Sequence, residues 1–265
     1  MSTHAPIDAD HLYADARVYD ILHRPGTADE VTTLERIAAR FGESRRADRW
    51  LEPACGTGRL LRVAAARGRR VTGFDLEPAM IEYARDRLKA QGLASRARLF
   101  VADMRSFADH AGPPADLAFC TINTIRHLTT DDAMLRHFQQ AARALRPGAL
   151  YVVGLSTTLY GCEQETEDVW QATRAGTRVT QTVQYLPPSP ADRAETVISH
   201  LEIERTGRAT ESRTSRYTLR SYSLSEWTGL VDASGFELLA PVDDGAFQID
   251  PPRTGYAHWV LRAPG

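Results

Sequence analysis

The sequence predicts an α/β fold: a doubly wound, Rossmann-like sheet of seven mostly parallel strands, with an antiparallel β insert before the last helix. Between residues 49 and 156, short apolar runs alternate with amphipathic helical patterns, as in strands joined by crossover helices. After Ser156 this alternation stops, and strands with a strict apolar–polar period follow one another. Near residue 223 the helix–strand pattern resumes, so the last segments are expected to rejoin the first sheet.

The predicted elements of the core follow in a regular order. A helix at 27–42 comes first, with acidic residues in its first turn and Gly42 at its end. The core strands are predicted at 49–54, 71–75, 97–103, 115–121, 149–156, 236–242 and 255–264. Its further helices are predicted at 58–68, 77–92, 130–148 and 224–235. Thr130 is the expected N-cap of the third of these, and Pro147-Gly148 is its expected end.

Three or four further strands form the predicted insert, from the alternating stretches at 168–174, 177–186, 194–205 and 214–223. The chain is therefore divided into an N-terminal helical cap segment at 1–44, a core at 45–164 and 223–265, and the insert at 165–222. The insert is expected to be either a substrate lid or a dimer surface, and a homodimer is one expected state.

Composition excludes several classes of partner. The 265 residues carry a formal net charge of −2, which gives no reason to expect nucleic acid or an anionic membrane as partner. We find no signal-peptide pattern at the start, and no apolar run approaches the roughly 20 residues of a membrane span. Three cysteines without CxxC spacing favour reduced thiols and a cytoplasmic protein. No cluster has metal-ligand spacing, so no metal is expected.

A glycine-containing stretch, "EPACGTG" at 52–58, lies where the first strand turns into a helix. Its glycines let a ligand approach bare backbone, but the third glycine of a dinucleotide fingerprint would fall at Leu61. A ligand without a pyrophosphate is therefore favoured. Asp75 ends the second strand, as a carboxylate for ribose hydroxyls does, and Asp103 ends the third, within reach of an adenine edge. Ribose, adenine and a phosphate-free tail describe S-adenosylmethionine.

Four stretches, "EPACGTG", "GFDLEPAMIEYAR", "VADM" and "LRPGALYVV", resemble in order and spacing the class I S-adenosylmethionine-dependent methyltransferases. The resemblance implies cofactor contacts in three groups. The methionine moiety would be surrounded by Glu52, Ala54, Gly56 and Gly58. Asp75 would bind the ribose, Leu76 or Met80 would flank the adenine, and Asp103 with Met104 would read its edge.

The segment "YADARVYDILH" at 13–23 resembles the aromatic segment that covers the cofactor in small-molecule members of this family. By this resemblance Tyr19 would hydrogen-bond the methionine end, with Tyr13 a second candidate. The whole layout resembles nucleotide-sugar N,N-dimethyltransferases of antibiotic pathways and glycine N-methyltransferase-like enzymes. It implies N- or O-methylation of a small molecule, in natural-product biosynthesis. The alternatives are a cofactor-binding protein that transfers no methyl group (cyclase-type or regulatory) and a nicotinamide oxidoreductase.

The segment "CTINTIRHL" at 120–128 is expected beside the reacting methyl group, because it follows the fourth strand at the same sheet edge. We predict Asn123 as a positioning residue, His127 as a base and Arg126 as a contact for an anionic substrate group. The alternative is a solvent-facing His127 and a surface ion pair for Arg126. Four aromatic residues of the insert either line a substrate pocket or pack in its core: Trp170, Tyr185, Tyr217 and Tyr222. Tyr222 is the predicted substrate contact among them.

Overall fold

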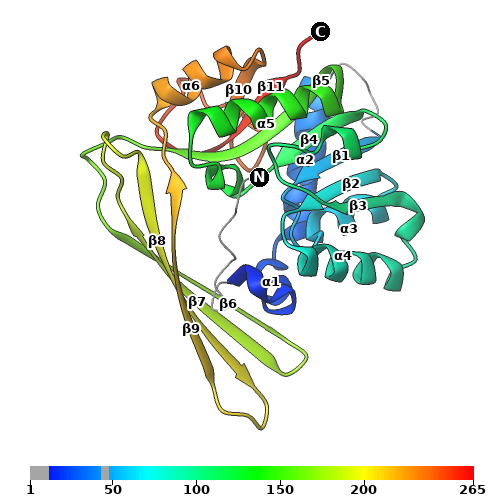
Figure 1. Cartoon of the computed structure of the whole chain (residues 1–265), viewed down its shortest axis with the longest axis vertical. Helices are drawn as coiled ribbons and strands as arrows, with labels where there is room; N and C mark the ends of the chain where they lie inside the picture. The colour runs from blue at the N-terminus through cyan, green and yellow to red at the C-terminus, as the bar shows by residue number, and fades with distance from the viewer. Residues whose placement is uncertain (1–11, 43–47) are drawn as a thin grey trace.

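The computed structural model describes residues 12–42 and 48–265, and it contains two sheets (Figure 1). The larger sheet has seven strands in the order β10-β11-β5-β4-β1-β2-β3. These strands are β1 (Arg49–Pro53), β2 (Arg70–Asp75), β3 (Ala97–Val101), β4 (Ala115–Cys120), β5 (Leu145–Thr157), β10 (Glu237–Val242) and β11 (Gly255–Arg262). Only β11 runs against its neighbours β5 and β10, whereas the β1, β2, β3, β4 and β5 pairings are parallel. The predicted fold class is confirmed.

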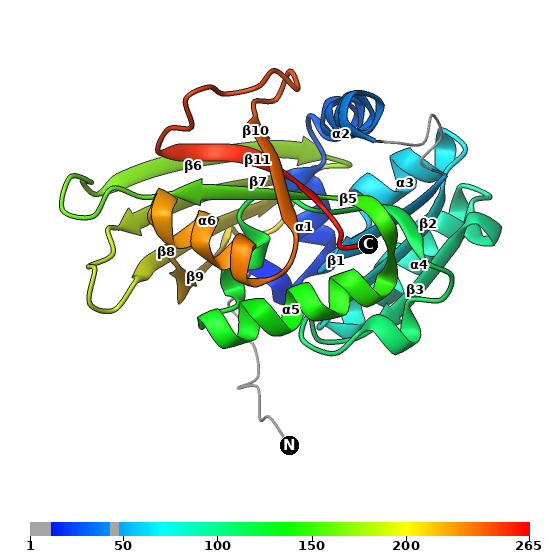
Figure 2. The ribbon, with the colours of Figure 1, turned by 90° about the horizontal axis from the view of Figure 1, so that it is seen from above.

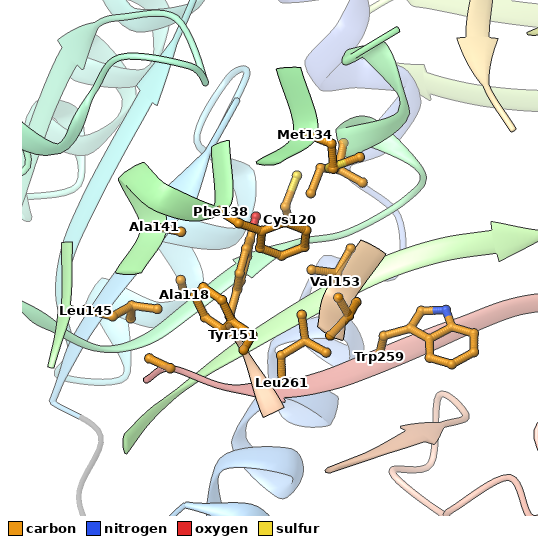
Figure 3. Packing of buried hydrophobic residues seen from close by; sticks show 14 of the residues in the cluster. Ala118, Cys120, Met134, Phe138, Ala141, Leu145, Tyr151, Val153, Trp259 and Leu261 are labelled. Atoms are coloured by element: carbon orange, nitrogen blue, oxygen red, sulfur yellow. The ribbon is translucent and has the colours of Figure 1, made fainter. Parts of the chain in front are cut away.

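Helices cover both faces of this sheet, as Figure 2 shows. Apolar side chains of α5 (Asp131–Ala144) and α6 (Leu224–Ala233) are buried on one face. Those of α2 (Thr27–Phe41), α3 (Arg59–Ala66) and α4 (Pro78–Ala90) are buried on the other. Figure 3 shows the first of these layers, in which Phe138 of α5 lies against Tyr151 of β5. Short 3-10 helices complete the core: η1 (Leu12–Ala14), η2 (Ala94–Arg96), η3 (Ala108–His110) and η4 (Thr124–His127).

The end of α5 differs from its predicted position. The helix begins after its cap Thr130, whose side chain accepts from the Ala133 N–H, but it ends at Ala144, and β5 already begins at Leu145. Pro147 explains the early end, because a proline disfavours helical backbone in the residue before it and donates no N–H. The predicted helix end at 148 is therefore wrong by about one turn.

The smaller sheet contains only antiparallel neighbours, in the order β6-β7-β8-β9. Its strands are β6 (Thr166–Arg174), β7 (Thr177–Leu186), β8 (Ala194–Arg205) and β9 (Glu211–Arg220), all within the segment 165–222. One face of it is apolar, because Val179, Leu201 and Ile203 are buried while the residues between them are not. The helix α1 (Ala16–His23) packs against that face, and it lies between the two sheets (Figure 1).

The buried carboxylate of Asp20 links α1 to three other elements. It accepts hydrogen bonds from Arg62 of α3, from the Tyr83 hydroxyl of α4 at 3.0 Å and from Arg174 of β6 at 2.9 Å. Because Asp20 is fully buried, these donors compensate for the desolvation of its carboxylate. Part of the predicted cap segment, residues 1–11 and 43–44, lies outside the described residues. None of the helices in the described parts of the chain is long and apolar enough to span a bilayer.

Candidate functional site

Two adjoining cavities open at the carboxyl ends of the parallel strands. The first, called here the strand-tip cavity, has a volume of about 570 Å³ and is lined by residues at or just after the ends of β1, β2 and β3, among them Gly56, Asp75 and Asp103. The second, the insert cavity, has a volume of about 780 Å³ and includes Asn123 of the core and Trp170 of β6. The residues that line both cavities, called the junction, are Tyr13, Tyr19, Thr124, His127 and Tyr217.

The turn after β1 presents bare backbone to the strand-tip cavity. Gly56 has a φ of +52°, and a Cβ atom there would lie 3.3 Å from the Tyr19 ring, so a side chain at this position would be strained and crowded. Ala54 also adopts positive φ and lines the cavity. Gly58 does not line it: a Cβ there would lie 3.2 Å from the Ala84 Cβ of α4. Gly58 therefore allows close helix packing, and its predicted cofactor contact is not supported.

Asp75 is held in a fixed orientation at the end of β2. Its Oδ2 accepts the Gly56 N–H at 2.8 Å, and its Oδ1 accepts the Glu77 N–H at 3.0 Å. Burial raises the pKa of Asp75, and these two backbone donors oppose that shift. Leu76 and Met80 line the same cavity beside it. Each carboxylate oxygen keeps a second lone pair for a donor inside the cavity.

Glu52 is 7% exposed and is not among the lining residues of either cavity. Its Oε2 has no hydrogen-bond partner among the described residues. Burial raises the pKa of Glu52 well above its ordinary value, against the attraction of Arg59. A buried carboxyl oxygen without a hydrogen-bond partner destabilises the fold, and it can accept a hydrogen bond from a ligand, directly or through one water.

The loop after β3 is supported by a residue of α5. Asp103 and Met104 line the strand-tip cavity, and the Asp103 carboxylate also accepts two bonds from the Arg105 side chain, at 2.9 and 2.5 Å. Beneath the loop, His137 Nδ1 lies 2.9 Å from the Met104 carbonyl and Nε2 lies 2.6 Å from the Tyr151 hydroxyl. A carbonyl only accepts, so Nδ1 carries the proton and Tyr151 donates to Nε2. Burial lowers the pKa of His137 to about 4, which keeps this neutral tautomer.

The η4 segment brings polar groups to the junction. His127 Nε2 lies 3.2 Å from the Tyr13 hydroxyl, and its ring stacks on Tyr217 at 5.6 Å between centroids. Asn123 has a φ of +60°; its Oδ1 accepts the Ser156 N–H at 2.7 Å, and its Nδ2 donates to the Ser156 Oγ at 3.0 Å. Asn123 therefore joins η4 to the end of β5 while lining the insert cavity.

Two predicted substrate contacts have other roles in the structure. Tyr222 is fully buried outside both cavities, with its ring 5.7 Å from that of Trp227, so the prediction of substrate contact is wrong. Tyr222 comes shortly after the end of β9, and its side chain lies in the hydrophobic core against residues of α6. Arg126 lines the insert cavity, but it donates to the Arg220 carbonyl at 2.7 Å and to Glu195 at 2.9 Å. Its charge is already neutralised by an acid of the insert.

Several lining residues were not predicted from the sequence. They come from α1, from the first turn of α2, from β6 and from the β10–β11 connection: His23, Asp29, Glu30, Asp168 and Asp244. No local motif marks them, since they meet only through the packing of α1 and the insert on the core. Three of the four insert aromatics, Trp170, Tyr185 and Tyr217, do line the insert cavity. Across the described residues, no group of three or more His, Cys, Asp or Glu side chains could hold a metal ion.

Comparisons with known proteins agree with this geometry. Residues 51–148 match a family model described as a methyltransferase domain. The dTDP-4-amino-2,3,4,6-tetradeoxy-D-glucose N,N-dimethyltransferase of Saccharopolyspora spinosa is 28% identical over 229 residues, which are 85% of this chain and 78% of that protein.

Two solved structures show the same fold. An S-adenosylmethionine-dependent methyltransferase from Clostridium acetobutylicum ATCC 824 superposes with a TM-score of 0.72 at 16% identity, over 94% of this chain and 98% of that chain. The sugar N-methyltransferase KedS8 from Streptoalloteichus sp. ATCC 53650 superposes with a TM-score of 0.72 at 20% identity, over 100% and 99%. The segment matched by the family model contains the strand-tip residues from Glu52 to Met104.

Proposed function

Because this chain is a class I S-adenosylmethionine-dependent methyltransferase, we propose that it methylates the amino nitrogen of a small amino sugar in natural-product biosynthesis. The two joined cavities carry the proposal, because they provide one compartment for the cofactor and one for an acceptor. The curated relative and KedS8 are both named as sugar N-methyltransferases. The match of residues 51–148 to a methyltransferase domain favours methyl transfer over the alternatives of a nicotinamide oxidoreductase and a cofactor-binding protein that transfers no methyl group.

The strand-tip cavity suits the cofactor. The bare Gly56 backbone leaves space for the methionine moiety. Glu52 does not line the cavity, and we assign its orphaned oxygen as an acceptor that the methionine moiety reaches through one water. We assign the ribose hydroxyls to Asp75, the faces of the adenine to Leu76 and Met80, and its edge to Asp103 with Met104. Ala54 and Tyr19 complete the wall. The bound cofactor supplies an activated methyl group, and the chain has to align it.

The junction is where we propose that transfer occurs. The acceptor nitrogen approaches from the insert cavity, and its lone pair forms the new C–N bond as the methyl–sulfur bond breaks. The nitrogen then releases one proton, to His127 or to water. Asn123 and the aromatic ring of Tyr217 hold the sugar against the junction. The insert, whose inner face closes this cavity, acts as the lid.

Replacing His127 by Asn is expected to lower kcat about tenfold while changing the affinity for S-adenosylhomocysteine less than twofold. The effect is moderate because a neutral amine can also lose its proton to water. His200→Asn is the matched control, since His200 is exposed on the outer face of the insert, where Nδ1 contacts the Thr214 hydroxyl at 2.8 Å. Equal kcat losses in both variants, measured by steady-state kinetics, would exclude a role for His127 at the reacting nitrogen.

Replacing Tyr151 by Phe tests the support of the adenine loop. The change leaves His137 Nε2 buried without its donor. We expect about fivefold weaker binding of S-adenosylhomocysteine, corresponding to about 1 kcal/mol, with kcat at saturating cofactor unchanged. Titration calorimetry and steady-state kinetics measure both. Tyr160→Phe, which removes the hydroxyl that contacts Glu226 at 3.0 Å, should leave the affinity as it is. An unchanged affinity in Tyr151→Phe would contradict the assignment of this loop to adenine.

The function itself is tested by incubating the protein with methyl-labelled S-adenosylmethionine and a panel of amino sugars. The proposal expects S-adenosylhomocysteine and an acceptor heavier by one or two methyl groups on nitrogen. A labelled methyl group on a hydroxyl oxygen would show O-methylation and would contradict the proposed N-methylation. A cytoplasmic location is part of the proposal, supported by the free cysteines Cys55, Cys120 and Cys162. The homodimer stays a prediction, which sedimentation measurements test.

A further inference from the structure

The insert cavity is lined by four carboxylates that approach it from three sides. Asp29 and Glu30 lie in the first turn of α2, Asp168 on β6, and Asp244 in the connection between β10 and β11. Glu30 is neutralised by Arg59, which donates to both of its oxygens at 2.5 and 2.8 Å. Asp244 contacts His258 at 3.0 Å, but its side chain is 90% exposed. Within the described chain, Asp29 and Asp168 have no side-chain hydrogen bond or ion pair.

Few cations balance these acids. Among the described residues that line the cavity, the only arginine or lysine side chains are Arg36 and Arg126. Arg36 has no side-chain hydrogen bond or ion pair within the described chain, so it is the single cation set against the carboxylates of Asp29, Asp168 and Asp244. Arg126 is 5% exposed and is paired with Glu195, so it offers no charge to a ligand. Burial lowers the pKa of His23 to about 3, which leaves this ring neutral. The one lysine of the chain, Lys89, lies on α4 and does not line the cavity.

This charge pattern is unsuited to a diphosphate. Phosphates are bound in proteins by arginine, lysine or the free N–H groups of a helix N-terminus. The N-terminus of α2 does reach the cavity, but its own Asp29 and Glu30 supply negative charge there. A cavity with carboxylate walls concentrates cations and repels anions, because a recess focuses the field of its lining charges. A protonated amine is the ligand that this field attracts.

We propose that the acceptor is a phosphate-free amino sugar, free or attached to a neutral aglycone, and not a nucleoside diphosphate sugar. The proposal rests on the proposed function and narrows its substrate class. The amine enters as a cation between Asp29, Asp168 and Asp244, and it transfers its proton to solvent water before it reaches the junction. Apolar faces of the sugar or aglycone lie against Trp170 and Tyr185. The acceptor therefore differs from the dTDP-linked sugar in the name of the curated relative.

A matched pair of acceptors tests this proposal. The methyl glycoside of 4-amino-4,6-dideoxyglucose and the dTDP conjugate of the same sugar present the same amine with and without a diphosphate. We expect kcat/KM for the glycoside to exceed that for the conjugate at least tenfold at low salt. Its KM should rise with ionic strength, as expected for attraction between charges. Preference for the dTDP conjugate, or inhibition by dTDP alone, would overturn the proposal.

Charge variants locate the effect on the cavity wall. Asp168→Asn is expected to raise KM for the glycoside about threefold to fivefold and to flatten its salt dependence, with unchanged affinity for S-adenosylhomocysteine. Glu167→Gln is the control: it makes the same charge change at the adjacent residue of β6, which contacts Gln184 and does not line the cavity. Equal changes of KM in both variants would show that the effect comes from the overall negative charge of the insert, and would contradict a specific amine site at Asp168.

Binding measurements separate this proposal from the proposed function. Calorimetry with the S-adenosylhomocysteine complex can detect the glycoside and dTDP without any methyl transfer. If neither acceptor is methylated but the glycoside binds in a salt-dependent way and dTDP does not, the proposed reaction fails and the charge preference stands. If the dTDP conjugate is methylated on nitrogen in preference to the glycoside, the reaction stands and the charge preference fails.

Discussion

Replacing Asp75 by Asn is expected to weaken the binding of S-adenosylhomocysteine about 100-fold, corresponding to about 2.7 kcal/mol. The reason is that the two ribose hydroxyls of the ligand lose the charged carboxylate that accepts their hydrogen bonds. The substitution also turns one oxygen into an NH2 group. Asp75 accepts the N–H groups of Gly56 and Glu77, so the substitution leaves one of these two donors without its acceptor. Both losses act on the strand-tip cavity. Calorimetric titration with S-adenosylhomocysteine measures the effect.

Two controls keep this result specific to the ribose. Asp86→Asn removes a carboxylate from an exposed position of α4 and should leave the affinity unchanged. Titration with 2′-deoxy-S-adenosylhomocysteine should reduce the affinity of the parent protein by about tenfold and that of Asp75→Asn much less. Normal cofactor binding by Asp75→Asn would contradict the assignment of the ribose hydroxyls to Asp75 at the end of β2.

Replacing Glu52 by Gln is expected to raise the stability of the ligand-free protein and to lower its affinity for S-adenosylhomocysteine. In the ligand-free protein burial disfavours the ionised form of Glu52, which the unfolded chain adopts at pH 8, so a neutral amide should raise the free energy of unfolding at that pH by about 1 kcal/mol, or the melting temperature by about 2–4 °C. The affinity for S-adenosylhomocysteine should fall about tenfold, because an amide cannot ionise as Glu52 does when the ammonium of the ligand binds beside it. Thermal unfolding and calorimetry measure the two effects.

The sign of the pH dependence follows from the raised pKa of Glu52, which is caused by burial. Above the ordinary pKa of a glutamate, the unfolded chain has released the proton that the folded chain still holds. The free energy of unfolding therefore falls as the pH rises, until Glu52 ionises in the folded state as well. The parent should show this loss and Glu52→Gln should lack it. Glu237→Gln, at an exposed position of β10, is the control. Parallel pH profiles for the parent and Glu52→Gln would contradict a buried, protonated Glu52.

Residues at the ends of parallel strands were predictable, because the topology of such a sheet brings those ends to one edge. The structure accordingly has Asp75, Asp103 and Met104 on one cavity wall. The direction of a side chain was less predictable. Gly58 follows the same glycine turn but faces Ala84 of α4, and Tyr222 follows an insert strand but is buried beside Trp227.

Residues that meet through long-range packing were beyond prediction from a local pattern. Asp29 and Asp168 reach the same cavity from α2 and β6, which are far apart in the sequence. The buried pair of His137 and Tyr151 is another example, since one residue looks like part of an amphipathic helix and the other like part of an apolar strand. The contact of His137 with the Met104 carbonyl depends on how α5 packs on the sheet.

A crystal structure of the protein with S-adenosylhomocysteine and the amino-sugar glycoside tests the account most directly. We expect the ribose hydroxyls within hydrogen-bond distance of Asp75, the adenine beside Met80 and Met104, and the sulfur at the junction facing His127. The acceptor nitrogen should lie in line with that sulfur, and its sugar should extend into the insert cavity. A cofactor bound elsewhere, or a sulfur directed away from the insert cavity, would contradict the account.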